Sequence, residues 1–207
     1  MPNHTQIKLS VKKKGSGKYA NSKKIDVLDA PPAMAGDRMA ALLSRFTFQK
    51  IVPMPDYHED YGGRLDATKP TSARLSDEPS SNDWYSWRLD HWDTKWDAYD
   101  VYSGVDTYNE DETINLYKSG GHFTTAWSPP YSVINKMQML FPDFEISMKY
   151  LDEGYMFAGQ MFSNGEVVEA SDRSSTLFEV IEKAYLLDFI SSEERYDMHK
   201  ENEEVGG

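Results

Sequence analysis

The chain has 207 residues and no cysteine, 39% of its residues are hydrophobic and 13% aromatic, and its formal net charge is −12. The length allows one large or two small domains with a sizeable core, and the aromatic content excludes a wholly disordered chain. The lack of cysteine excludes a disulfide framework, a thiolate zinc site and a cysteine nucleophile. No apolar run approaches the ~20 residues of a membrane helix, and the N-terminus lacks the apolar segment of a secretory signal. We therefore expect a cytoplasmic protein that makes no membrane contact.

Charge is distributed unevenly along the chain. Residues 1–24 contain seven lysines and no acidic residue, whereas residues 25–207 contain the other 15 basic residues and all 34 acidic residues. The acidic residues are dense over 52–112 and again over 191–207. Such a surface repels nucleic acid and attracts basic partners within a Debye length of ~8–10 Å. Two interpretations stay open: charge that keeps the protein soluble, and an acidic face that engages a basic protein.

The first third of the chain mixes one clear strand with long polar segments. Alternating apolar residues predict a half-buried strand over 5–11. Residues 12–24, rich in lysine, glycine and serine, are typical of an exposed loop. Apolar spacing predicts a short helix over 34–46, followed by a strand over 46–52. Prolines and small polar residues over 56–82 indicate a long insertion.

The rest of the chain alternates strands and helices. Helical spacing and start signals predict three helices, over 84–91, from Ser128-Pro129-Pro130 to Phe141, and over 176–189. Strand patterns predict five strands, over 96–102, 113–117, 122–127, 144–150 and 155–162, with a Ser119-Gly120-Gly121 hairpin between the second and third.

This order predicts an α+β fold. We expect a ferredoxin-like split β-α-β sandwich, with a mainly antiparallel sheet, helices on one face, an inserted Trp-rich helix and a C-terminal helix. Residues 1–190 are expected to form one domain, with a Lys-rich loop at 12–24 and an insertion at 56–82. Residues 191–207, acidic and poor in large apolar side chains, are expected to be a disordered tail.

The sequence contains few patterns that indicate catalysis. None of the five histidines forms a helical metal-binding pair, and the acidic cluster at His58-Glu59-Asp60 is better explained as a solvated loop. No phosphate-binding loop or nucleophile elbow occurs. Carboxylates are so numerous that spacing cannot single out an acid–base pair. We expect no catalytic residue, no metal and no cofactor.

The aromatic block from Trp84 to Tyr99 is the most distinctive local feature. Its rings would each bury ~150–250 Å² if they pack in the core, and two alternatives are contact with a partner protein and stacking on nucleic-acid bases. Interleaved aspartates argue against nearby phosphates: Asp83, Asp90, Asp93, Asp97 and Asp100.

One basic patch stands against this acidic background. It is a solvated loop or a contact site for nucleic acid or another acidic surface, and in the second case binding would depend strongly on salt. Its residues are Lys12, Lys13, Lys14, Lys18, Lys23 and Lys24.

Several long segments together resemble a known family. They are Met1-Pro-Asn3, residues 46–55, residues 84–101, residues 123–130, Phe141-Pro142, residues 152–154 and residues 157–159. They resemble the YubB ferredoxin-like family of proteins that phages and conjugative plasmids carry, over roughly residues 1–165. The resemblance implies a ferredoxin-like fold in the bacterial cytoplasm and no established activity. His4 departs from the family, which tends to have Trp there, and the loop at 12–24 is longer than usual. Positions that we expect to be structural are Trp84, Trp87, Trp92, Trp96, Trp127, Pro129, Pro130 and Gly154.

The leading hypothesis is a non-enzymatic accessory protein of a phage or plasmid. It would bind and modulate a host protein with a basic surface, such as a defence or nucleic-acid-handling factor. A second hypothesis is a nucleic-acid binder that uses the Lys-rich loop and one sheet face. A third is a small-ligand binder or enzyme with a pocket near Trp96 and Trp127. The leading hypothesis places the contact on seven acidic residues: Asp56, Glu59, Asp60, Asp106, Glu110, Asp111 and Glu112.

Overall fold

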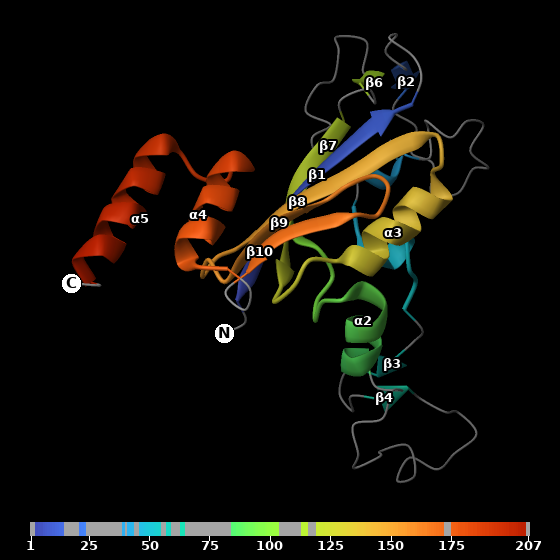
Figure 1. Cartoon of the computed structure of the whole chain (residues 1–207). Helices are drawn as coiled ribbons and strands as arrows, with labels where there is room; N and C mark the ends of the chain where they lie inside the picture. Colours follow the sequence, from blue (N-terminus) through green and yellow to red (C-terminus); the bar gives the residue numbers. More distant parts are fainter. Residues whose placement is uncertain are drawn as a thin grey trace.

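A six-stranded antiparallel sheet is the centre of the fold, with strand order β10-β9-β8-β1-β7-β5 (Figure 1). A computed structural model of the chain describes residues 3–14, 21–23, 39, 41–43, 46–54, 57–58, 63–64, 84–103, 113–115, 119–171 and 175–205. The sheet strands are β1 His4–Lys13, β5 Tyr99–Ser103, β7 Ser119–Ala126, β8 Phe144–Asp152, β9 Phe157–Met161 and β10 Val167–Ser171. The helices are the 3₁₀-helix η1 Phe48–Lys50, α2 Trp84–Trp92, α3 Tyr131–Leu140, α4 Leu177–Leu186 and α5 Ser192–Val205.

The main core lies on one face of this sheet, which we call the first face. Alternate residues of β1 and β8 point to it, because successive side chains of a strand point to opposite sides. They are Ile7, Leu9 and Val11 of β1 and Ile146, Met148 and Tyr150 of β8, all buried. The inner side of α3 packs on them through Val133, Ile134 and Met137, and α2 lies next to α3.

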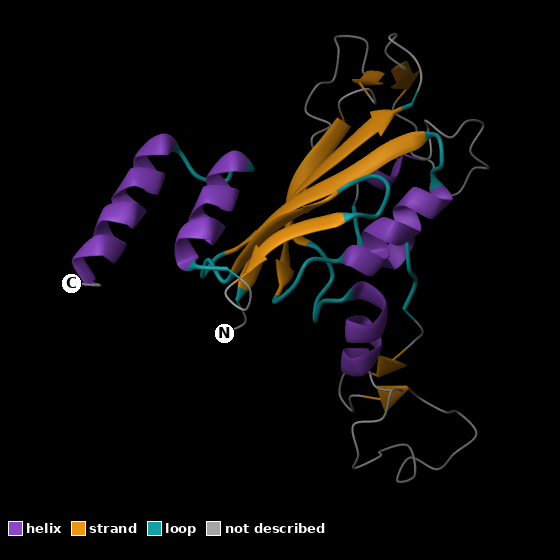
Figure 2. Cartoon of the chain, viewed as in Figure 1, coloured by secondary structure: helices purple, strands orange, loops and turns teal. Residues whose placement is uncertain are grey.

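The second face carries a smaller core under α4. Leu151 of β8 and Ala158 of β9 contact Val180, Ile181 and Ala184 of that helix. A capping box starts α4: Thr176 and Glu179 each accept from the other's backbone N–H. The antiparallel α+β fold is thus confirmed, but helices lie on both faces of the sheet rather than on one (Figures 1 and 2). Two consecutive apolar residues at the end of β8 explain this difference. Tyr150 and Leu151 point to opposite faces and are both buried, so each face needs a helix to cover it.

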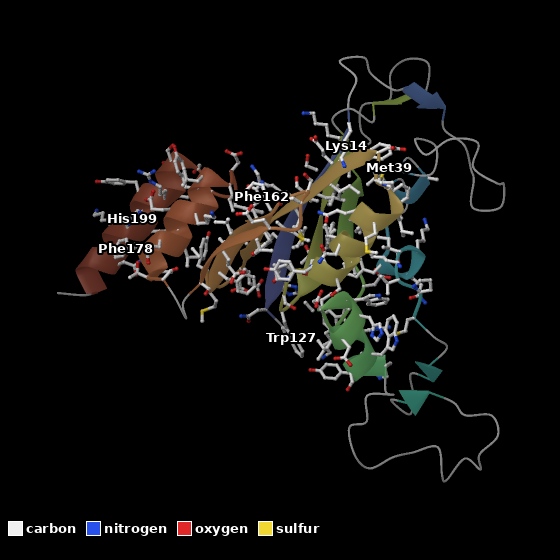
Figure 3. The ribbon with its side chains drawn as sticks, turned by 45° about the vertical axis from the view of Figure 1, so that its right-hand side comes forward. Lys14, Met39, Trp127, Phe162, Phe178 and His199 are labelled. Carbon is white, nitrogen blue, oxygen red and sulfur yellow. The ribbon has the colours of Figure 1, made fainter. Side chains whose placement is uncertain are left out.

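The expected disordered tail is wrong for residues 192–205, which form α5. Three residues on one side of α5 hold it against α4. His199 stacks on the Phe178 ring and its Nε2 lies 2.8 Å from Glu182, while Arg195 lies 3.4 Å from the same carboxylate (Figure 3). Met198 packs against the small core. The prediction failed because the overall composition of this segment is acidic, whereas the few residues that contact α4 are not.

The pairing of the short strands also differs from expectation. Lys12 and Lys13 belong to β1, and β2 Asn21–Lys23 pairs with β6 Thr113–Asn115, so the loop at 12–24 is partly strand. The expected hairpin at residues 119–121 is wrong, because these residues are in β7 and pair with β1 and β5. Within the insertion at 56–82, the described residues form the pair β3 Tyr57–His58 and β4 Gly63–Arg64.

Candidate functional site

The tryptophans of α2 divide into core and surface. Trp92 and Trp87 are buried, with 1% and 9% of their surface exposed. Trp92 Nε1 donates to the carbonyl of Val52 at 3.0 Å, and the Trp87 ring stacks on His91 with 4.2 Å between centres. The packing interpretation therefore holds for these two rings. Trp84, at the start of α2, stays partly exposed.

The turn that follows α2 is fixed by polar contacts to β7 and α3. Thr94 is fully buried; its hydroxyl donates to the carbonyl of Ala126 at 2.7 Å and accepts from the N–H of the same residue at 3.1 Å. Asp93 has a positive φ of 60°, and its carboxylate accepts the N–H of Ser132 at 2.5 Å in the first turn of α3. Its carbonyl accepts from the Ser128 hydroxyl. The turn thus joins three elements.

One acidic residue of the aromatic block, Asp97, binds backbone N–H groups and a hydroxyl group in the neighbouring segments. Its carboxylate accepts the backbone N–H of Phe48 at 2.6 Å and that of Ala98 at 2.7 Å. It also accepts a hydrogen bond from the Thr47 hydroxyl. The carboxylate therefore ties the turn to the start of η1, and its role is structural.

Three rings from separate segments meet around Lys95 and form what we call the aromatic surface. The Lys95 ammonium nitrogen lies 5.0 Å from the centre of the Trp127 ring, 5.4 Å from Trp96 and 6.0 Å from Tyr85. Tyr85 comes from α2, Trp96 from the turn, and Trp127, which is labelled in Figure 3, directly follows β7. These distances are those of cation–π contacts.

The aromatic surface is open to solvent at Trp127. This ring is 38% exposed, and its backbone has a φ of 78°, with its N–H donating to the carbonyl of Asn3 at 2.9 Å. Tyr85 and Trp96 are half-buried. Tyr85 meets the Trp127 ring edge-on at 6.1 Å. Exposed indole on a fixed frame is typical of protein-contact surfaces.

Two exposed carboxylates act on Tyr99, the neighbour of Trp96, and the basic residue Arg88 of α2 is engaged with rings. Asp90, Asp100 and Glu153 are exposed. Arg88 lies over the rings of Trp84 and Trp92 at 4.9 and 5.3 Å. Near the rim, burial and the carboxylates of Asp100 and Glu153 raise the pKa of Tyr99 to about 12. The Tyr99 hydroxyl is hydrogen bonded with Nδ1 of His4, the residue that departs from the resembled family.

A second candidate surface lies on the second face, across β5, β7, β1 and β8. The Tyr102 ring is 63% exposed and stacks on His122 with 4.6 Å between centres. The pairing register places Lys8 beside His122 and Lys149 beside Lys8. These four side chains form a row of two rings and two lysines.

The two lysines of this row already have partners. Lys8 donates to the carbonyl of Asp188 and lies over the Phe189 ring, and Lys149 lies 3.5 Å from the Asp188 carboxylate. Desolvation lowers the pKa of Lys8, and the Asp188 charge opposes this shift. The segment after α4 therefore covers one end of the row.

A buried tyrosine and a half-buried one, Tyr150 and Tyr131, meet on the first face beside β10. Tyr150 donates to Glu169 at 2.9 Å, and the Tyr131 hydroxyl lies 2.7 Å from that of Tyr150 and 3.1 Å from the same carboxylate. Burial raises the pKa of both tyrosines, so neither hydroxyl loses its proton near neutral pH. This cluster holds α3 to the sheet.

The predicted acidic contact residues lie outside the described residues: Asp56, Glu59, Asp60, Asp106, Glu110, Asp111 and Glu112. Lys18 and Lys24 of the basic patch lie outside them too, whereas Lys12 and Lys13 are in β1, Lys14 follows it and Lys23 is in β2. The structure therefore brings none of the seven acids into a described site.

The remaining signature residues have structural places. Pro129 and Pro130 are buried and precede α3, with Pro130 rather than Ser128 at its N-cap. Gly154 follows β8, and its N–H donates to the Asp152 carboxylate at 3.0 Å. The place near Trp96 and Trp127 where a pocket is expected holds the Lys95 side chain. Sequence reasoning missed Lys95, because the three rings around its ammonium group come together only in the tertiary structure.

The described residues include no group of three metal-ligating side chains placed to hold an ion. None of the helices in the described ranges is long and apolar enough to cross a membrane.

Comparison with known proteins finds one family whose range covers most strands of the sheet. Residues 91–188 match the family described as the ferredoxin-like domain in Api92-like protein. This range contains β5, β7, α3, β8, β9, β10 and α4. No curated protein and no solved structure matches the chain. The match supports the ferredoxin-like fold expected from the sequence.

Proposed function

We propose that this ferredoxin-like protein is a non-enzymatic accessory protein that binds a basic host protein through its aromatic surface. The phage or plasmid setting and the bacterial cytoplasm come from the resemblance to the YubB family. Modulation of the bound host protein, such as a defence or nucleic-acid-handling factor, is the role that this setting suggests. The contact on the acidic residues of 56–60 and 106–112 stays part of the proposal.

The observation that carries the proposal is the exposed ring of Trp127 beside Tyr85 and Trp96. Tryptophan and tyrosine are enriched where proteins bind each other, and a few such residues supply most of the binding free energy. The exposed carboxylates of Asp100 and Glu153, which act on Tyr99 beside Trp96, favour a partner with positive charge. The protein's net charge of −12 acts in the same direction at longer range.

Trp127→Ala should reduce capture of the partner at least about tenfold, because a truncated aromatic hot spot typically costs 2 kcal/mol or more. The measurement is affinity capture from bacterial host lysate with the tagged full chain, at low and high salt. A partner retained at low salt and released at high salt is expected for wild type. Tyr196→Ala on α5 is the matched control, since Tyr196 is 68% exposed and distant in sequence from these rings. Equal capture by Trp127→Ala and Tyr196→Ala would contradict the proposal.

A second candidate function is binding of single-stranded nucleic acid on the second face. The observation that favours it is the exposed Tyr102–His122 stack in a row with Lys8 and Lys149. Rings on a sheet surface can stack on bases, and neighbouring lysines can contact phosphates. The lysines of residues 12–24 continue from β1, which is the strand that contains Lys8.

This candidate predicts binding that weakens steeply with salt. Single- and double-stranded oligonucleotides are compared by fluorescence anisotropy at about 50 and 200 mM salt. Tyr102→Ala should weaken single-strand binding about tenfold, because one stacked base is lost. Tyr196→Ala again serves as the control. An unchanged anisotropy with every probe at the lower salt removes this candidate.

A further inference from the structure

We infer that the aromatic surface is a binding site for the guanidinium group of an arginine side chain, and that Lys95 fills it when no ligand is bound. The ammonium nitrogen of Lys95 lies within 6.0 Å of three ring centres. Rings that surround a cation in this way are the usual means of recognising cationic groups without an ion pair. That the arginine belongs to a basic host protein rests on the proposed function; the site itself does not.

The rings are held in place by contacts that do not involve the Lys95 side chain. Trp127 is fixed through its backbone N–H, and its neighbour Ser128 bonds to the carbonyl of Asp93. Trp96 meets Tyr99 edge-on at 5.9 Å, and the Tyr99 hydroxyl donates to the carbonyl of Thr125 at 3.2 Å. Tyr85 and Trp127 also meet edge-on at 6.1 Å, so each of the three rings has a contact that would remain if the Lys95 side chain moved away.

Lys95 is held weakly enough to be displaced. No carboxylate among the described residues forms an ion pair with its ammonium group, so its contacts there are the three rings. A cation–π contact at an exposed site is among the weaker interactions in a protein. The long flexible stem of a lysine also allows the ammonium group to return to water.

Guanidinium suits these rings better than ammonium does. It is planar and less strongly hydrated, so it stacks on indole with a smaller loss of hydration. The same molecule shows this chemistry nearby, where the Arg88 guanidinium lies over Trp84 and Trp92. Trp127 is 38% exposed and gives a route in from solvent. The exposed carboxylates of Asp100 and Glu153, which act on the adjacent Tyr99, favour a cation over an anion.

The test is a titration of the full chain with capped Gly-Arg-Gly, followed by tryptophan fluorescence and by the indole N–H signals in NMR spectra. Capped Gly-Lys-Gly is the comparison peptide. Lys95→Ala vacates the site and should tighten binding of the arginine peptide about fivefold. Lys95→Arg places a stronger competitor in the site and should weaken it by a similar factor. Trp127→Ala should abolish the response, and Lys136→Ala on α3 should change nothing.

Equal affinity in wild type, Lys95→Ala and Lys95→Arg would overturn the inference, as would equal affinity for the arginine and lysine peptides. Because Lys95→Arg keeps the charge and length of the side chain, it reports on the site even where Lys95→Ala impairs folding. A titration that succeeds while Trp127→Ala leaves partner capture unchanged rejects the proposed function alone. A titration that fails while Trp127→Ala abolishes capture rejects the guanidinium site alone.

Discussion

Gly159→Ala should lower the free energy of unfolding by about 3 kcal/mol, the upper range for an overpacked core. A Cβ atom at this position would lie 2.3 Å from the Tyr150 hydroxyl oxygen and 2.5 Å from its Cζ. Tyr150 is on β8 and lies opposite Gly159, which is on β9. The Tyr150 ring cannot move away, because it is fully buried and meets the rings of Tyr131 and Phe157. A shift of the ring would also break the hydrogen bond to Glu169.

Urea denaturation of the full chain measures this effect. Two further variants serve as a control and as a test of the steric cause. Gly165→Ala is the control: its φ of 86° costs an alanine about 1 kcal/mol, and the nearest atom to the new Cβ is 3.6 Å away. Tyr150→Phe in the Gly159→Ala background should restore only part of the loss, since Cζ stays too close. A Gly159→Ala protein as stable as Gly165→Ala would show that β8 and β9 are spaced differently.

Asp97→Ala should lower the free energy of unfolding by about 3 kcal/mol. Its carboxylate accepts from the N–H groups of Phe48 and Ala98, and removing it leaves both donors without this partner, at about 1–3 kcal/mol for each buried donor. Phe48 is fully buried, so water does not take the place of the carboxylate at its backbone N–H. The turn that contains Lys95 and Trp96 would lose its tie to η1, and the aromatic surface should loosen.

Denaturation gives the stability, and the indole N–H signals in NMR spectra report on the aromatic surface. Asp97→Asn is the matched variant: it keeps one acceptor oxygen without the charge and should lose about half as much. Asp90→Ala is the control, because Asp90 is exposed on α2. If Asp97→Ala and Asp90→Ala unfold at the same urea concentration, the carboxylate does not hold this turn.

Local periodicity predicts most of the sheet and helices, because alternation and helical spacing report directly on burial. The predicted strand over 144–150 corresponds to β8, and the predicted helix over 176–189 contains α4. The pattern cannot say which strands pair, since pairing is decided by residues far apart. The two glycines of β7 indicate a turn in the sequence, yet Gly120 and Gly121 lie opposite Ser10 and Leu9 of β1.

The candidate site was harder to predict than the fold. The composition of the aromatic block indicates that its rings matter but not which are buried: Trp92 is buried, whereas Trp84 and Trp96 are half-buried. The aspartates of the block suggest repulsion of phosphate, whereas the structure uses Asp93 and Asp97 to cap backbone groups. Lys95 lies inside the block, and no local pattern distinguishes it from a solvated lysine.

The last helix of the chain has consequences for how the molecule opens. α5 packs on α4 through the side chains of Arg195, Met198 and His199, and it adds no strand to the sheet. The folded state of α5 therefore depends on its packing against α4 and not on the main core. Amide protons in α5 are expected to exchange with solvent through a partial opening that leaves the sheet folded. For β1, which pairs with β7 on one side and β8 on the other, we expect exchange only when the whole sheet unfolds, so its free energy of opening should exceed that of α5.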